Sequence, residues 1–116
     1  MNSNPNTESE SATEKSLFGL NSELIEQFHQ VFRKHPAIQQ VLIYGSRARG
    51  THRPNSDIDL TMTGADLTHS EALTIASELD DLHHPYLIDL SIKSQISSEA
   101  LLRQMEKEGR VFYLAQ

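Results

Sequence analysis

The sequence predicts an α+β domain in which a small mixed β-sheet is covered by helices. Its length of 116 residues suits one domain with a modest core. Apolar residues recur at helical spacing in some segments and run together in others, in the order helix, strand, turn, strand, helix, strand, helix. Only a short loop separates the first two strands, whereas helices precede and follow the third. This order favours an α+β fold over a doubly wound one.

The composition excludes several classes of protein. Residues 1–16 include only Met1 and Ala12 as apolar types, so we expect a disordered tail there and a domain over 17–116. The chain has neither a signal-peptide core nor an apolar run that could span a bilayer. The lack of cysteine favours a reducing, cytoplasmic location. The net charge of −6 argues against direct nucleic-acid binding, which needs a basic surface.

The first half of the domain predicts a helix and two strands. A helix over about 21–34 presents one apolar face, and Pro36 helps to end it. A strand over 39–44 leads into the sequence SRARG, which predicts a short helical turn. A loop follows, and a second strand over 57–63 ends at Gly64.

The second half predicts two helices around a third strand. Thr68 and Glu71 have the spacing of a capping box, so a helix begins there. A strand over 86–92 follows, with Asp89 on the side opposite to its isoleucines. The last helix covers about 98–108, and Gly109 suits the position after its end. Residues 111–114 fit either a short strand or packed coil.

Residues 41–62 contain most of the candidate functional residues. The apolar run that ends at Tyr44 meets Gly45-Ser46, a small-residue turn that can bring backbone amides close to a phosphate. Ten residues later comes Asp57, and Asp59 follows on the same predicted strand. Alternation would place both carboxylates on one side, where they repel each other unless a cation lies between them. Hard divalent cations, Mg²⁺ above all, suit such oxygen ligands.

Asp89 interrupts an otherwise apolar segment. A buried carboxylate without a partner is costly, and a metal shared with Asp57 and Asp59 would supply one. Such a set can hold two Mg²⁺ ions that clamp the attacking and leaving oxygens. Asp89 would then lie nearest the incoming hydroxyl and accept its proton. The alternative is an edge-strand residue that faces water.

These residues resemble a known family. Gly45-Ser46, the Asp57-x-Asp59 pair and a later strand with Asp89 are similar to the DNA polymerase β-like nucleotidyltransferase superfamily. The GSRARG and SDID sequences and the short chain resemble, more narrowly, its minimal nucleotidyltransferase (MNT) domains. The resemblance covers about residues 22–114 and implies the polymerase β-like palm fold.

The resemblance also implies a reaction and a set of site residues. Such domains use Mg²⁺ to transfer a nucleoside monophosphate, usually AMP from ATP, to a hydroxyl and release pyrophosphate. Asp57, Asp59 and Asp89 match the catalytic metal ligands, and Gly45 and Ser46 match the phosphate-binding turn. Arg47 and Arg49 are further candidates for contacts to the triphosphate, because guanidinium groups suit phosphate oxygens; the alternative for each is a surface arginine.

A partner follows from the same resemblance. Many MNT proteins are antitoxins that add AMP to a tyrosine of an all-helical HEPN toxin encoded nearby, so we expect a hetero-oligomer with such a protein. Two other functions stay open: an antitoxin that acts by binding alone, and a transferase whose small-molecule or RNA acceptor is bound by a separate subunit. The nucleotide preference and the acceptor rest on the resemblance alone.

Overall fold

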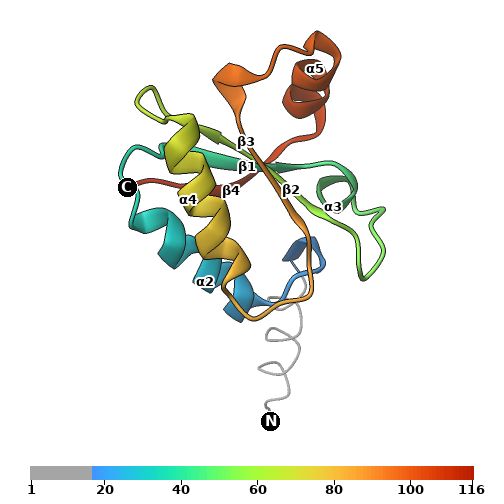
Figure 1. Ribbon diagram of the computed structural model, residues 1–116. Helices are drawn as coiled ribbons and strands as arrows, with labels where there is room; N and C mark the ends of the chain where they lie inside the picture. Colours follow the sequence, from blue (N-terminus) through green and yellow to red (C-terminus); the bar gives the residue numbers. More distant parts are fainter. Residues whose placement is uncertain (1–16) are drawn as a thin grey trace.

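A computed structural model describes residues 17–116; the predicted tail over residues 1–16 lies outside them. Four strands form one sheet in the order β3-β2-β1-β4 (Figure 1). The strands are β1 (Gln40–Tyr44), β2 (Ile58–Thr63), β3 (Ile88–Ile92) and β4 (Arg110–Leu114). The helices are η1 (Leu17–Gly19), α2 (Ser22–Arg33), α3 (Ser46–Arg49), α4 (His69–Asp80), η2 (Lys93–Gln95) and α5 (Glu99–Glu108). The predicted mixed sheet with covering helices is confirmed.

The strand directions follow from the connections. β1 pairs antiparallel with both β2 and β4, whereas β2 and β3 are parallel and are joined through α4. A parallel pair needs such a crossover, because its second strand must start at the same end of the sheet as the first. The Thr68 hydroxyl accepts a hydrogen bond from the Glu71 amide at 3.1 Å, which is half of the predicted capping box.

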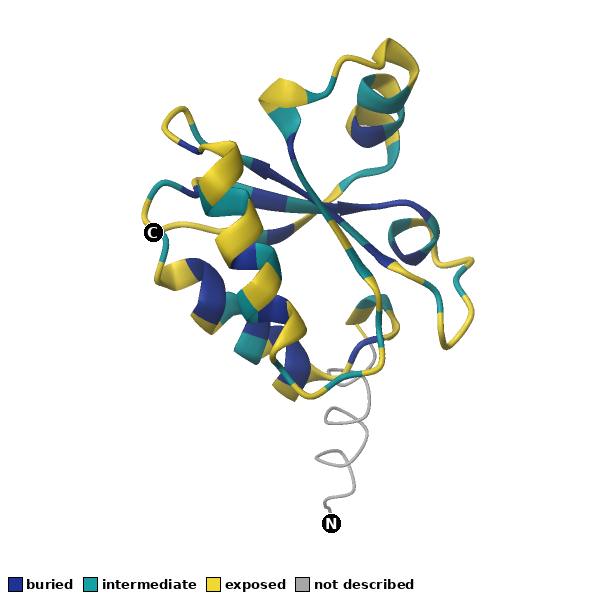
Figure 2. Ribbon diagram, viewed as in Figure 1, coloured by how far each residue is buried: buried dark blue, intermediate teal, exposed yellow. Residues whose placement is uncertain are grey.

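The two faces of the sheet differ. On one face, alternate residues of all four strands are buried in a single apolar core against α2 and α4, which lie side by side (Figures 1 and 2). The strand residues of this core are Val41, Ile43, Ile58, Leu60, Met62, Ile92 and Phe112. The opposite face is more polar: Thr61 is fully buried there, and the Ser91 hydroxyl donates to it at 2.9 Å.

Two strands begin later than predicted. β2 begins at Ile58, so Asp57 lies in the preceding loop, and β3 begins at Ile88 rather than Tyr86. Residues 111–114 belong to β4, which pairs with β1 through a shift in register. The last helix ends at Glu108, but Gly109 has φ −66° and is not left-handed. The closely approaching carbonyl of Met105 is what leaves no room for a side chain there.

Within residues 17–116, every helix is too short or too polar to span a bilayer.

Candidate functional site

Three side chains form a row across the polar face of the sheet. The register pairs Tyr44 of β1 with Asp59 of β2, and Asp59 with Asp89 of β3. Paired residues on neighbouring strands project from the same face, so these three side chains lie next to one another. Two carboxylates that are far apart in the sequence are therefore brought together, as predicted, although Asp89 is exposed rather than buried.

The Gly45-Ser46 turn lies directly against this row. Gly45 has φ +76°, a conformation that favours glycine, and a Cβ placed on it would collide with the Oδ2 atom of Asp59. Ser46 then begins α3, whose first amides lack helical partners. The backbone at residue 45 and the Asp59 carboxylate can approach this closely only because residue 45 has no side chain.

The Asp59 carboxylate lies close to two other carboxylates. Burial raises its pKa above the ordinary value, and the nearby carboxylates of Asp89 and Asp57 raise it further. Arg47 and Arg49 act in the opposite direction but do not outweigh these effects. A site whose carboxylates repel one another in this way favours the binding of a cation.

Tyr44 belongs to the site although the sequence analysis treated it only as the end of a strand. Burial raises the pKa of its hydroxyl, and the charges of Asp89 and Asp59 raise it further. The side chain is almost fully buried. Its position directly before the Gly45-Ser46 turn was the available signal, but the register that aligns Tyr44 with Asp59 is a tertiary property.

The donor set suits a hard divalent cation in part. Asp59 and Asp89 stand level on strands that are roughly 4.8 Å apart, close enough for two carboxylates to share one ion. Asp57 differs: it is exposed and lies in the loop before β2. In the described part of the chain, no three His, Cys, Asp or Glu side chains form a metal-binding group. The residues thus fit magnesium through Asp59 and Asp89, and Asp57 stays a predicted third ligand.

Arg47 lies in a place that does not suit the expected phosphate contact. Its side chain is only 2% exposed, and its guanidinium donates hydrogen bonds to three backbone carbonyls. These belong to Phe18 at 2.9 Å, Pro54 at 3.2 Å and Ser56 at 2.9 and 3.2 Å. The Tyr86 ring also packs against the guanidinium, with its centroid 4.8 Å from Cζ. Arg47 therefore ties the loop before β2 and the η1 segment to α3.

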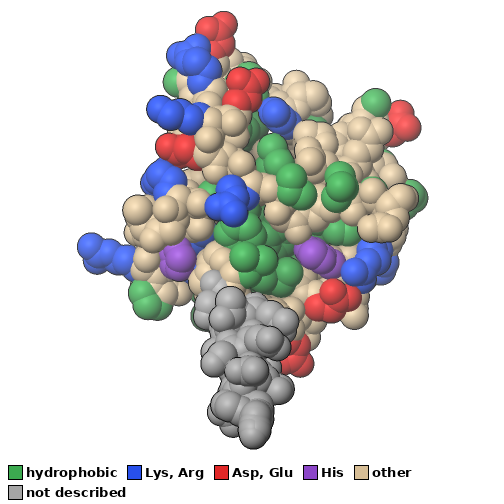
Figure 3. All heavy atoms as spheres, turned by 180° about the vertical axis from the view of Figure 1, so that it is seen from behind, with side chains coloured by type: hydrophobic (Ala, Val, Ile, Leu, Met, Phe, Trp, Pro, Cys, Tyr) green, Lys and Arg blue, Asp and Glu red, His purple; other side chains and the backbone are tan. Residues whose placement is uncertain are grey.

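Arg49 remains available on the surface. It is exposed and forms an ion pair with Glu108 at 2.9 Å, an interaction that exposed groups exchange readily. Lys and Arg side chains gather along the side of the molecule that carries α3 and α5 (Figure 3).

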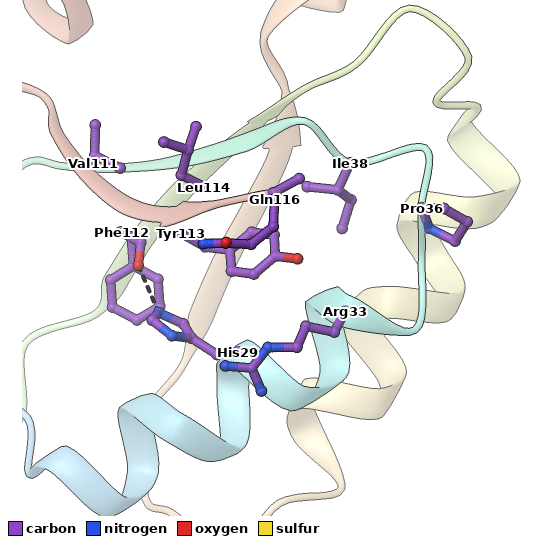
Figure 4. Close-up of a pocket in the computed structure, with 10 residues that line it drawn as sticks. His29, Arg33, Pro36, Ile38, Val111, Phe112, Tyr113, Leu114 and Gln116 are labelled. Atoms are coloured by element: carbon purple, nitrogen blue, oxygen red, sulfur yellow. Dashed lines mark hydrogen bonds between the residues drawn. The ribbon is translucent and has the colours of Figure 1, made fainter.

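A cavity of about 630 Å³ lies elsewhere, between α2 and the outer side of β4 (Figure 4). Its lining includes His29, Arg33, Phe112 and Tyr113 but no carboxylate side chain. The row at Tyr44, Asp59 and Asp89 contains two carboxylates that can bind a cation, whereas the cavity lining contains none. We therefore take the row and its glycine turn as the candidate site.

Comparison with known families places the chain in one of them. The model of the family "Polymerase beta, Nucleotidyltransferase" matches residues 26–116, most of the chain. The chain belongs to this nucleotidyltransferase family. The match includes the Gly45-Ser46 turn and all three predicted carboxylates.

Several solved structures are similar over most of the chain. A toxin–antitoxin crystal structure with AMP-PNP has 28% identity and a TM-score of 0.59, and the match covers 79% of this chain and 74% of that chain. The MntA–HepT toxin–antitoxin structure has 22% identity and a TM-score of 0.61, with 83% and 74% covered.

A third similar structure is a tri-AMPylated Shewanella oneidensis HEPN toxin in complex with MNT antitoxin. It has 23% identity and a TM-score of 0.54, with 81% of this chain and 72% of that chain covered. No curated protein sequence matches the chain significantly.

Proposed function

We propose that this nucleotidyltransferase moves AMP from ATP to a tyrosine hydroxyl of a HEPN partner and acts as the antitoxin of that toxin. The observation that carries the proposal is the level pair Asp59 and Asp89 beside the Gly45-Ser46 turn. The family match supports nucleotidyl transfer, and the similar toxin–antitoxin structure with AMP-PNP supports ATP and the biological role.

The reaction divides between the two ends of the site. The Ser46 amide and hydroxyl, at the start of α3, bind the oxygens of the triphosphate tail. Asp89 accepts the proton of the acceptor hydroxyl, whose oxygen then forms a bond to the α-phosphorus. The bond from the α-phosphorus to the bridging oxygen breaks, and pyrophosphate leaves with that oxygen.

Asp59 and Asp89, with Asp57, would hold magnesium. When bound, Mg²⁺ neutralises charge on the phosphates and on the carboxylates. Because Gly45 has no side chain, the Asp59 carboxylate can lie against the phosphate turn. The metal ligand and the triphosphate contacts are therefore neighbours. Arg49 would contribute a phosphate contact on leaving Glu108.

The acceptor comes from a separate protein in this proposal, which implies a hetero-oligomer. The AMPylated toxin in the Shewanella oneidensis complex indicates the product to look for, one or more AMP groups on the HEPN protein.

The experiment combines purified protein, ATP, Mg²⁺ and the HEPN protein encoded beside this chain, and measures the mass of the HEPN protein. We expect gains of one or more AMP units with the wild type. Asp59→Asn should reduce the rate by about a thousandfold, the upper range for loss of one transition-state contact. Asp66→Asn is the matched control, because Asp66 is an exposed aspartate in the loop after β2.

Unchanged mass of the HEPN protein with wild-type enzyme would refute the transfer. The second candidate function is neutralisation by binding alone. It is favoured by Asp57, which is exposed and, in the described part of the chain, belongs to no metal-binding group. A toxicity assay distinguishes it from AMP transfer. If Asp59→Asn protects cells as well as the wild type, binding is sufficient and catalysis is not the basis of the antitoxin effect.

A further inference from the structure

We infer that the free edge of β3 binds an extended segment of the partner protein, which adds a strand to the sheet and presents its acceptor hydroxyl to Asp89. This inference rests on the proposed function and adds to it the surface that selects the acceptor. It follows from the directions of the main-chain groups of β3, the hollow beside them, and the charge of the adjacent carboxylates.

The main-chain groups of β3 alternate between its two sides. The Ile58 amide donates to the Leu87 carbonyl at 2.9 Å, so residue 87 faces β2. Alternation then turns the amide and carbonyl groups of Ile88 and Leu90 away from β2, toward the edge of the sheet. Within residues 17–116 no other strand pairs with that edge. The edge therefore offers an unpaired row of donors and acceptors, which an extended peptide can complete.

A hollow of about 280 Å³ lies beside this edge. It is bounded by α4, β3 and the segment after η2, and its lining includes Leu73, Leu90 and Ile96. Leu73 is 60% exposed, and Leu87, directly before β3, is 73% exposed. Apolar side chains of a bound strand would cover both, because alternate residues of a strand project to opposite sides.

The row of the candidate site leads to the same edge. Asp59 and Asp89 are level, and Asp89 is on the outermost strand. A strand added beside β3 would place one side chain level with Asp89, with neighbouring Cβ atoms roughly 5 Å apart. That side chain would project from the same face of the sheet as Asp89, which is where an acceptor hydroxyl is needed.

Charge specifies the occupant further. Asp57 and Asp89 are exposed, and Asp89 is level with Asp59, so three carboxylates lie at this edge. A segment with Lys or Arg two residues from its hydroxyl residue, on the same side of the added strand, therefore complements this edge, whereas an acidic segment would be repelled. The occupant that fits is a basic, extended loop or terminus of the partner, with apolar residues for the hollow.

The other sheet edge is less suited to such pairing, because part of it is bulged and capped. β4 has a register shift after its pairing with Leu42, and its outward Phe112 carbonyl accepts a hydrogen bond from His29 Nε2 at 2.6 Å (Figure 4). Bulges and capped groups are common ways in which proteins prevent the pairing of edge strands. Of the two edges, β3 is thus the more open one.

The first experiment follows backbone amides in the wild-type protein by NMR, with and without the HEPN protein encoded beside this chain. We expect hydrogen exchange at Ile88 and Leu90 to slow at least roughly tenfold in the complex, as pairing protects amides. The β4 amides should keep their rates. A stable complex in which the rates at Ile88 and Leu90 are unchanged would overturn the inference.

The second experiment measures AMP transfer by two lysine variants with matched exposure. Leu73→Lys alters the hollow, and Leu114→Lys alters the β4 edge, where the leucine is 59% exposed. We expect Leu73→Lys to raise the KM for the partner roughly tenfold, as for loss of a central interface contact, without changing the affinity for AMP-PNP. Leu114→Lys should change neither value.

The outcomes separate the inference from the proposed function. If the wild type modifies the partner and Leu73→Lys does so equally well, the docking site is wrong and the transferase stands. If the wild type binds the partner with protection at Ile88 and Leu90 but transfers no AMP, the docking site stands and the proposed reaction is wrong.

Discussion

The two edges of the sheet do different work. The β3 edge is short of partners: Asp89 and Leu87 are exposed there, and the carboxylates of the site repel one another. The β4 edge is rich in contacts: the Phe112 ring lies within about 6.3 Å, centroid to centroid, of the rings of Phe18, Phe28, His29 and Phe32. The β3 edge therefore holds the carboxylates of the candidate site, and the β4 edge holds aromatic contacts that stabilise the fold.

This difference indicates which substitutions should change activity and which should change the free energy of unfolding. Changes on the β3 side should alter activity with little loss of folding free energy, because its carboxylates repel one another or are exposed. Changes on the β4 side should alter the free energy of unfolding, because its aromatic groups are packed.

The largest expected effect is at Asp59. Asp59→Asn should lower the rate of nucleotidyl transfer about a thousandfold and leave the free energy of unfolding at pH 7 equal or higher, because it removes a repelled, half-buried charge. Steady-state rates and urea denaturation of the same sample measure both. A large loss of stability would contradict the division between the edges.

Next is Phe112, on β4. Phe112→Ala should reduce the free energy of unfolding by about 3–5 kcal/mol, because the ring is buried in the core cluster and its removal leaves a cavity. Urea denaturation measures the change. Val111→Ala is the control, since this neighbour is exposed; equal losses for both variants would show that the aromatic cluster is not the source of stability.

A smaller effect is expected at His29, which caps the β4 edge. His29→Leu removes the hydrogen bond to the Phe112 carbonyl and should cost about 1 kcal/mol in the free energy of unfolding. It should also speed hydrogen exchange in β4. His83→Leu, at an exposed histidine, is the control and should change neither quantity.

The smallest effect is on the slope of stability with pH. Asp59 has a raised pKa, so its destabilising charge is present above that pKa and is relieved as the pH falls through it toward 3.8, its ordinary value. Glu78 is opposite: hydrogen bonding to His35, at 2.8 Å, lowers its pKa, so its stabilisation is present above 4.5 and is lost as the pH falls.

Denaturation of wild type, Asp59→Asn and Glu78→Gln between pH 3 and 7, a window set by these two shifts, checks this prediction. On acidification, the wild type should gain stability relative to Asp59→Asn and lose it relative to Glu78→Gln. Parallel curves for all three proteins would show that neither carboxyl group has the shifted pKa on which the signs depend.

The sequence predicted what depends on local patterns. The helix predicted over about 21–34 and observed over Ser22–Arg33, the capping at Thr68 and the placement of Asp89 opposite the isoleucines of β3 all follow from spacing along the chain. The Gly45-Ser46 turn next to Asp59 was also predicted, since a hairpin-like connection brings such neighbours together.

What it missed depends on contacts between distant segments. The burial of Arg47 requires carbonyls from residues 18, 54 and 56 to converge, and no local pattern encodes that. The position of Asp57 outside the strand turns on one residue at a boundary, which patterns locate poorly. Which strands form the edges depends on the order β3-β2-β1-β4, and therefore the contrast between the edges could not be predicted either.

The anchoring of Arg47 gives the spacing of the motif a physical origin. The guanidinium, one residue beyond the glycine–serine turn, holds the carbonyls of Pro54 and Ser56 beneath α3, just before Asp57. The reach of the Arg47 side chain thus sets how far the residues before Asp57 can lie from the turn. A single insertion between Pro54 and Ser56 would therefore displace the acids from the turn.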